Sequence, residues 1–146
     1  MDLDEFRSRI NDLDEQILKL LNQRAEAALR IGELKRRQDL PYFVPEREAE
    51  IVRRLLSLNP GPLPAEGIKA VWREILSASL ALEHPLSVAY LGPPATFSHR
   101  AAVLRFGSSA TLVPARSIAE VFDEVERGRA EFGVVPVENS TEGSVN

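Results

Sequence analysis

Charged side chains interrupt an apolar seam in the first part of the chain. From Leu3 to Leu20, apolar residues recur at alternating steps of three and four, the period of one face of an amphipathic helix. The next step predicts an apolar residue at position 24, where the chain has Arg24. Because burying an unpaired arginine is costly, we expect Arg24 to face an anion or a carboxylate. Lys35 lies eleven residues further on, close to three helical turns, and on nearly the same face.

Two later helical segments also carry polar residues on or beside their apolar stripes. These residues are Arg47, Glu48, Ser79 and Glu83. With the cations of the first segment included, basic residues outnumber acidic ones, so the pattern predicts a pocket for an anionic ligand among three helices. The alternative interpretation is an internal salt-bridge network, or charges that snorkel at a helix edge.

Arg7 extends the cationic set but stands apart from it. It lies seventeen residues before Arg24, roughly 25 Å along a helix axis, so one small ligand cannot touch both side chains of one helix. In an antiparallel dimer, Arg7 of one chain reaches the pocket of the other. A helix over about residues 3–37 would be roughly 50 Å long, too long for a small monomer to cover, which also predicts a homodimer.

The positions of proline and glycine predict an all-α domain at residues 1–84, with one long helix and two shorter ones. The second helix begins at Pro45, the breaker Asn59–Pro62 ends it, and the third runs from about Pro64 to before Pro85. An incomplete α/β segment of order β-α-β-α-β follows at 86–146, which implies a parallel sheet. Its strands are expected at 88–91, 111–113 and 132–137, and its helices at about 98–106 and after a Ser117–Glu120 capping box. Because this segment is marginal alone, we expect it to be loosely ordered or to lean on the helical part.

Composition excludes several classes of function. The net charge of -4 does not favour binding to nucleic acid or to an anionic membrane. No apolar stretch is long enough to span a membrane. Without cysteine, and with only His84 and His99, neither a metal site nor a cofactor is expected. The acidic N-terminus lacks the features of a signal peptide, so a cytoplasmic location is expected.

The ordered set of motifs between about residues 3 and 84 resembles the all-helical chorismate mutases. The matching stretches are Arg7, Leu13-Asp14, Leu20-Leu21-Asn22-Gln23-Arg24, Ile31-Gly32-Glu33-Leu34-Lys35, Pro45-Glu46-Arg47-Glu48 and Arg73 to Glu83. The resemblance implies an intertwined homodimer that converts chorismate to prephenate, with two sites that each take one residue from the partner helix. This rearrangement needs neither a nucleophile nor a metal, only a held conformer and cationic stabilisation of the breaking C–O bond.

The resemblance also implies a role for each polar residue. Among the catalytic residues, Arg24 would bind a substrate carboxylate, while Lys35 and Glu83 would flank the ether oxygen. The substrate-binding residues would be Arg7 of the partner subunit, Arg47, Glu48 and Ser79. Of these, Arg7 of the partner subunit would bind the substrate carboxylates together with Arg24, and Arg47 would lie close by. Glu48 would accept from the ring hydroxyl, and Ser79 would line the pocket.

Two positions depart from the family pattern. Some members have glutamine where this chain has Glu83, and an ionised carboxylate would repel the ether oxygen that a neutral acid can hydrogen-bond. We therefore predict that Glu83 must be protonated for turnover. At Val44, some relatives have an acidic residue, so any contact made by that acidic side chain is missing here.

The second half resembles the start of a prephenate dehydratase, a periplasmic-binding-protein-like lobe, through residues 89–98 and 136–146. Mutase followed by dehydratase is the order of the bifunctional enzymes of phenylalanine biosynthesis, part of aromatic amino acid biosynthesis. Ser98 at a helix start, and Asn139 and Ser140 after a parallel strand, are possible substrate-binding residues. Alternatively, the two serines are caps and Asn139 forms a turn. The family's Thr-Arg-Phe motif and its regulatory domain are absent, so dehydratase activity is not expected.

Two further classes of function remain open. In a non-catalytic helical dimerisation module, Arg24 would pair with an acidic residue of the partner subunit. Arg24→Leu would then stabilise the protein. A regulatory ligand-binding module would keep the pocket without turnover, and only a rate measurement separates it from an enzyme.

Overall fold

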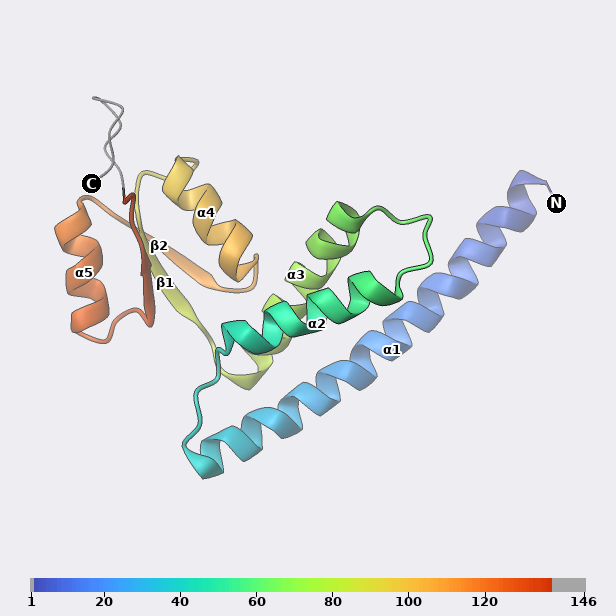
Figure 1. Ribbon diagram of the computed structural model, residues 1–146, viewed down its shortest axis with the longest axis horizontal. Helices are drawn as coiled ribbons and strands as arrows, with labels where there is room; N and C mark the ends of the chain where they lie inside the picture. The colour runs from blue at the N-terminus through green and yellow to red at the C-terminus, as the bar shows by residue number, and fades with distance from the viewer. Residues whose placement is uncertain (1, 138–146) are drawn as a thin grey trace.

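Three helices form the first part of the chain, and a small parallel sheet with two helices follows (Figure 1). The computed structural model describes residues 2–137. The elements are α1 (Leu3–Gln38), α2 (Pro45–Leu58), α3 (Ala65–Glu83), β1 (Ser87–Leu91), α4 (Phe97–Phe106), β2 (Thr111–Ala115), α5 (Ile118–Glu126) and β3 (Phe132–Val134). The expected fold class, a helical part before a small parallel sheet with helices, is confirmed.

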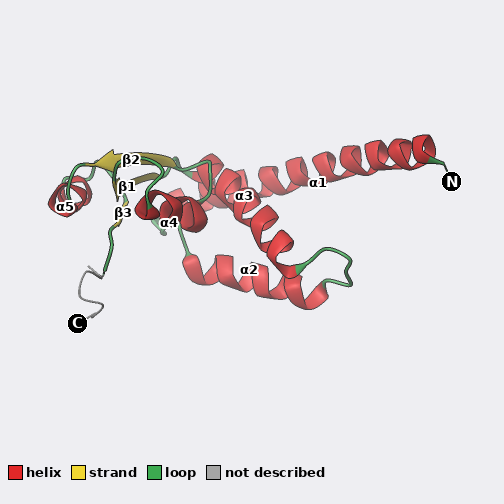
Figure 2. Ribbon diagram, turned by 90° about the horizontal axis from the view of Figure 1, so that it is seen from above, coloured by secondary structure: helices red, strands yellow, loops and turns green. Residues whose placement is uncertain are grey.

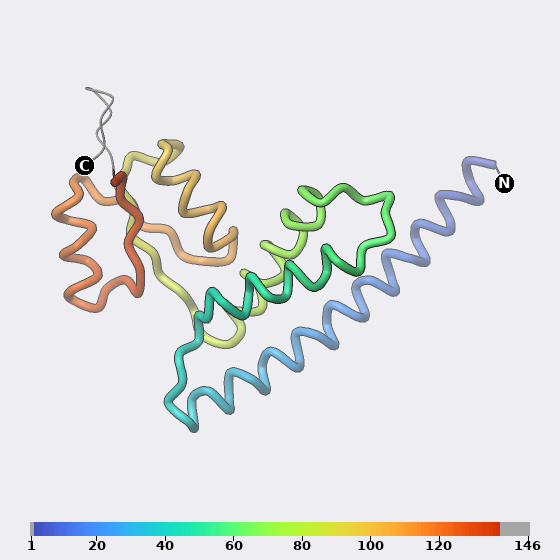
Figure 3. Tube along the Cα trace, in the orientation of Figure 1, coloured from blue at the N-terminus to red at the C-terminus, as the bar shows by residue number. Residues whose placement is uncertain are grey.

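Helix α1 has suitable caps and charges at both ends. The Asp2 carboxylate accepts from the Glu5 backbone N–H at 2.8 Å, and acidic residues lie in the first turn and basic residues in the last. The C-terminal half of α1 runs beside α3, whereas the N-terminal half projects away from the other helices (Figure 3). The apolar seam therefore stays uncovered in the single chain, with Leu13 43% and Leu20 62% exposed.

Helix α2 rests on α3 alone. Pro45 occupies its first turn, as the sequence predicts, and Asn59 ends it. Among the described elements, the backbone of α2 comes close to that of α3 but not to those of α1 or α4. Seen from above, α2 diverges from the line of α1 (Figure 2). This arrangement leaves space on both sides of α2.

The sheet has the strand order β2-β1-β3, with all strands parallel. Alternate residues of the central strand β1 face opposite sides, so Val88 joins the core beneath α4 and Ala89 the core beneath α5. The expected bounds of two strands were wrong. β2 continues past 113 through Pro114, because a proline is tolerated on an edge strand. β3 ends at Val134, since it pairs with β1 only over residues 132–134.

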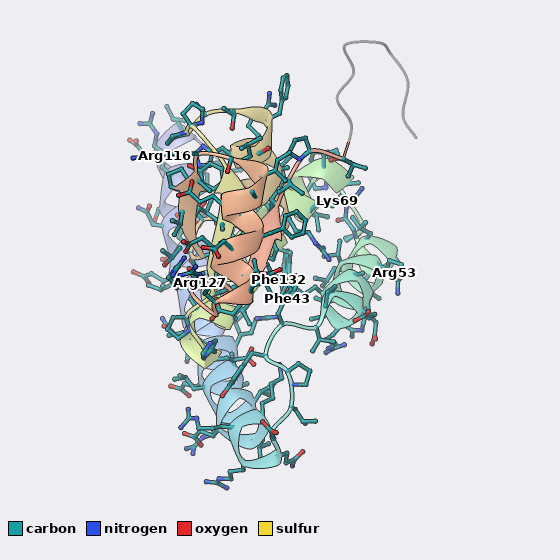
Figure 4. The ribbon with its side chains drawn as sticks, turned by 90° about the vertical axis from the view of Figure 1, so that its left-hand side faces the viewer. Phe43, Arg53, Lys69, Arg116, Arg127 and Phe132 are labelled. Atoms are coloured by element: carbon teal, nitrogen blue, oxygen red, sulfur yellow. The ribbon has the colours of Figure 1, made fainter. Side chains whose placement is uncertain are left out.

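The α/β segment leans on the helical part through a shared core. Phe43, in the connection before α2, contacts the rings of Phe106 and Phe132 at centroid distances of 5.4 and 5.1 Å. The buried Ser77 hydroxyl on α3 donates to the Phe106 carbonyl oxygen at 2.6 Å. Phe43 and Phe132 lie close together in Figure 4. None of the described helices is long and apolar enough to cross a membrane.

Candidate active site

One cavity of about 470 Å³ lies between α1, α2 and α3. It gathers every polar residue that the sequence pattern singled out in the helical part, apart from Arg7. These lining residues are Arg24 and Lys35 from α1, Arg47 and Glu48 from α2, and Ser79 and Glu83 from α3. Arg7 lies more than four turns before Arg24 on α1 and does not line the cavity.

Arg24 is held in the cavity by a hydroxyl. Its Nη1 donates to Ser79 Oγ at 2.9 Å, and Ser79 is only 9% exposed. The sequence predicted an anion or a carboxylate as the partner of Arg24, whereas within this chain the partner is neutral. The positive charge of Arg24 is therefore not compensated by this contact, and four other N–H donors of the guanidinium remain.

Lys35 is fixed at the other end of the cavity. Its Nζ donates to Glu83 Oε1 and to the Tyr42 carbonyl oxygen, both at 2.9 Å. The Lys35 and Glu83 side chains are 19% and 11% exposed, so this is a largely buried ion pair. The alternative of an internal salt bridge thus holds for this pair. One N–H of the ammonium group remains for a ligand.

Gly32 lets α1 and α3 approach at this point. A Cβ at Gly32 would lie 3.0 Å from the Glu83 Cα, a backbone atom that cannot move independently of α3. The missing side chain therefore allows the crossing that places Lys35, one turn further along α1, within reach of Glu83.

Glu48 is the other acid of the cavity. Burial raises the pKa of the Glu48 carboxyl above its ordinary value; the nearby Arg105 lowers it, Glu83 raises it and Lys35 lowers it. Burial is the largest of these effects, so Glu48 carries its negative charge at a free-energy cost.

Arg47 lies at the rim. Its Nη1 donates to Glu50 Oε1 at 3.0 Å, one turn along α2, and both side chains are more than half exposed. An exposed pair of this kind is weak, so Arg47 is free to turn towards a ligand at little cost.

Sequence reasoning missed two contributors. Tyr42 contributes its backbone carbonyl oxygen to Lys35. Every residue has this group, so the sequence could not single out Tyr42. Arg105 comes from α4 in the second part of the chain and reaches Glu48 only through tertiary structure.

Of the three residues proposed in the second part, only Ser98 lies among the described residues. Helix α4 begins at Phe97 and its N-cap is Thr96, whose hydroxyl accepts from the His99 backbone N–H, so Ser98 is not the cap. Ser98 lies instead in the first turn, because Thr96 already has the extended backbone of a cap. Asn139 and Ser140 lie outside the described residues. The described part of β3 ends at Val134, five residues before Asn139.

Comparison with known proteins identifies the helical part. The family model described as "Chorismate mutase type II" matches residues 6–84, which is more than half of the chain. The chain belongs to this family. The model described as "Prephenate dehydratase" matches residues 88–146 of this chorismate mutase family member.

Relatives of this chorismate mutase family member carry both family names. A bifunctional chorismate mutase/prephenate dehydratase from Aquifex aeolicus is 52% identical over 99% of this chain, and one from Escherichia coli is 30% identical over 97%. The chain spans 41% of the length of each relative. A solved chorismate mutase from Thermus thermophilus is 37% identical, covers 56% of this chain and 92% of its own, and superposes with a TM-score of 0.55.

Proposed function

We propose that the cavity between α1, α2 and α3 is the active site of a chorismate mutase that converts chorismate to prephenate. The observation that carries the proposal is the convergence of Arg24, Lys35 and Glu83, with Glu48 opposite, in one cavity of about 470 Å³. This volume suits a small ligand, and the lining combines apolar walls with a few fixed polar groups.

The polar groups are arranged for a dianionic substrate. Arg24, fixed by Ser79, binds one carboxylate, and Arg47 turns inwards from the rim to assist. Lys35 keeps its contacts with Glu83 and Tyr42 and donates its remaining N–H to the ether oxygen, which gains negative charge as the C–O bond breaks. Because these donors are held before the substrate arrives, little reorganisation is needed during the reaction.

Glu48 and Glu83 have different roles in this proposal. Glu48 accepts a hydrogen bond from the ring hydroxyl of the substrate as a carboxylate. Glu83 takes up a proton before turnover, although its ion pair with Lys35 opposes this, and then donates to the ether oxygen as a neutral acid. Lys35 contacts its Oε1, which leaves Oε2 to carry the proton.

The site takes its second carboxylate contact from another copy of the chain. The apolar seam of α1 is exposed in the single chain, and Arg7 lies at the projecting end. In an antiparallel pair, this seam covers that of the second copy and brings Arg7 of the partner subunit to the cavity. The proposed active form is therefore a homodimer, and its cytoplasmic location stays a prediction.

The sharpest test is complementation between two inactive variants, Arg7→Ala and Arg24→Ala. Each alone should lose about 10²-fold or more in turnover, because each removes a charged contact to the substrate. After equal amounts are mixed and allowed to exchange subunits, half the dimers are mixed, and each mixed dimer has one intact site. Chorismate disappearance should therefore recover to about a quarter of the wild-type rate.

The other candidate functions give different results in the same experiment. A non-catalytic dimerisation module shows no turnover in the wild type, and a site formed within one chain shows no recovery on mixing. Light scattering on each sample establishes that the variants are folded dimers, so a missing rate is not a folding defect.

A further inference from the structure

A second cavity lies on the opposite side of α2. It is bounded by α2, α3 and α4 and has a volume of about 430 Å³, within the range of small-molecule sites. Because the backbones of α2 and α4 do not come close to each other, α3 forms the floor between them. Apolar side chains line it, among them Phe43, Leu76, Leu104 and Phe106.

Four cations and a single acid line this second cavity. The cations are Arg53 from α2, Lys69 and Arg73 from α3, and Arg105 from α4, and the acid is Glu48. Arg53 and Lys69 appear on the same side of the molecule in Figure 4. Within residues 2–137, neither Arg53 nor Arg105 has an ion-pair partner, and Arg105 lies over the Phe43 ring at 5.6 Å. Lys69 pairs with Glu66 at 3.2 Å, and Arg73 Nε lies 3.5 Å from Glu74 Oε1, so the uncompensated positive charge of the cavity comes from Arg53 and Arg105.

Arg73 is the lining cation whose buried hydrogen-bonding group is unsatisfied within the described residues. Its Nε is buried, and no described group accepts a hydrogen bond from it, although Glu74 Oε1 lies 3.5 Å away. The other oxygen of Glu74 already accepts from the Ser108 backbone N–H at 3.0 Å. Protein atoms enclose the Nε, so a ligand cannot reach it directly. The Arg73 side chain is nevertheless 31% exposed, and no described hydrogen bond uses its Nη groups, which are the donors left for a ligand.

We propose that this cavity is a second binding site, for a small organic carboxylate with an apolar body. The carboxylate pairs with the Nη groups of Arg73 and with Arg105, with which no described acid forms an ion pair. The apolar body lies against Phe43, Leu104 and the α3 floor. An inorganic anion would leave that apolar surface uncovered, so the ring or chain attached to the carboxylate contributes to binding.

The second site communicates with the first through one wall. Glu48, Leu76 and Leu80 line both cavities. A carboxylate bound at Arg105 cancels the positive field that helps Glu48 to ionise, so Glu48 becomes a poorer acceptor for the substrate hydroxyl. Occupancy of the second site therefore raises the KM for chorismate. This consequence, unlike the binding itself, rests on the proposed function.

The test is a calorimetric titration of the chain with 3-phenylpropionate at neutral pH. Arg105→Gln and Arg73→Gln should each weaken binding by roughly tenfold or more, as expected for loss of a hydrogen bond between charged groups. Arg54→Gln is the matched control, because this exposed neighbour of Arg53 does not line the cavity. Arg24→Gln, which alters only the first cavity, should also bind the probe as the wild type does.

Three results would overturn the second site: no binding to the wild type, equal binding by all variants, or loss of binding in Arg24→Gln. The exposed Arg105 keeps the test decisive if the partly buried Arg73 variant fails to fold. In the kinetic arm, the probe should raise the chorismate KM of the wild type but not of Arg105→Gln. If the chain has no mutase activity, the proposed function fails, and the titration still decides the second site.

Discussion

The negative charge of Glu48 is less well compensated than that of Glu83, the other acid of the first cavity. Glu83 is compensated by Lys35 at 2.9 Å, whereas Glu48 has no ion-pair partner within the described residues and faces Arg105 and Lys35 only at longer range. A carboxylate in such surroundings is useful when it gains a hydrogen bond from a ligand. Without one, it destabilises the fold.

Replacement of Glu48 by glutamine should stabilise the protein at neutral pH while weakening the proposed mutase activity. Burial raises the pKa of Glu48 in the folded state, so its stabilising contribution is complete below the ordinary carboxyl pKa. That contribution is lost as the pH rises through the raised pKa. Glutamine carries no charge at any pH, so the Tm advantage of Glu48→Gln should be present at pH 7 and vanish in acid. Thermal melts at several pH values measure it, and a pH-independent difference would contradict the assignment.

The pH dependence of turnover should depend on Glu83. If the neutral acid donates to the ether oxygen, the wild-type rate falls as the pH rises. Glu83→Gln keeps a hydrogen-bond donor at every pH, so its rate should no longer fall as the pH rises. Steady-state rates of both proteins over a pH series provide the measurement. An unchanged profile in the variant would refute the role of protonated Glu83.

At the residue scale, the sequence predicted which polar residues lie in the cavity but not which groups they contact. A polar residue at a seam position indicates that something unusual faces it, which is why Arg24, Lys35 and Ser79 were found. Which group it meets depends on the distance between helices. Arg24 meets a hydroxyl and Lys35 meets a carboxylate and a backbone carbonyl. The site roles of these residues stay predictions.

The crossing of α1 and α3 depends on the absence of a side chain at Gly32. In Gly32→Ala, the new Cβ meets the Glu83 backbone at 3.0 Å, so α3 must shift by a few tenths of an ångström. That shift displaces Glu83 from Lys35. We expect turnover to fall by about tenfold, since small misplacements of catalytic groups are costly in rate.

Gly67→Ala is the matched control for this prediction. Gly67 also lies in a helix, and its Cβ would make only ordinary contacts with Pro64 at 3.5 Å. Alanine should stabilise α3 there by about 1 kcal/mol and leave the rate unchanged. Equal rates for wild type and Gly32→Ala would show that turnover does not depend on how this crossing positions Lys35 and Glu83.

At the element scale, the helices were predictable because their apolar periods and breakers agree. Pro45 and Asn59 mark α2 at both ends. The strands were less predictable, since their ends depend on pairing with β1 rather than on local composition. The expected strand at 111–113 stops short of Pro114, although an edge strand needs no N–H at that position and β2 continues to Ala115. The expected start of α4 at about Ser98 is late by one residue, since the cap is Thr96 and the helix begins at Phe97.

At the scale of the whole molecule, the two parts meet at Gly107. This residue has φ 75° and follows α4, and a Cβ there would lie 2.3 Å from the Ser77 Cβ on α3. The Ser77 hydroxyl bridges the same junction, donating to the Phe106 carbonyl oxygen and accepting from the Ser109 backbone N–H at 3.1 Å. The contact between the parts is thus specific at atomic distances.

Gly107→Ala should therefore destabilise both parts together. The positive φ and the overlap with Ser77 predict a loss of about 2 kcal/mol or more, and a decrease in Tm of roughly 5 °C. Far-UV circular dichroism, which follows the helices, and fluorescence of buried Tyr90 on β1, measured in a Tyr42→Phe, Trp72→Phe background, should report the same lower transition. Two separate transitions would mean that the parts unfold independently.

The support of α2 by a single neighbour has a consequence for hydrogen exchange. A helix with space on both sides loses few contacts when it opens, so its backbone amides exchange with deuterium through local opening. Those of α3, packed against α1, α2 and α4, exchange only through larger unfolding. A ligand in either cavity joins α2 to a second helix and slows its exchange. Deuterium uptake along Pro45–Leu58 would thus report ligand binding in either cavity without any dye or probe attached to the protein.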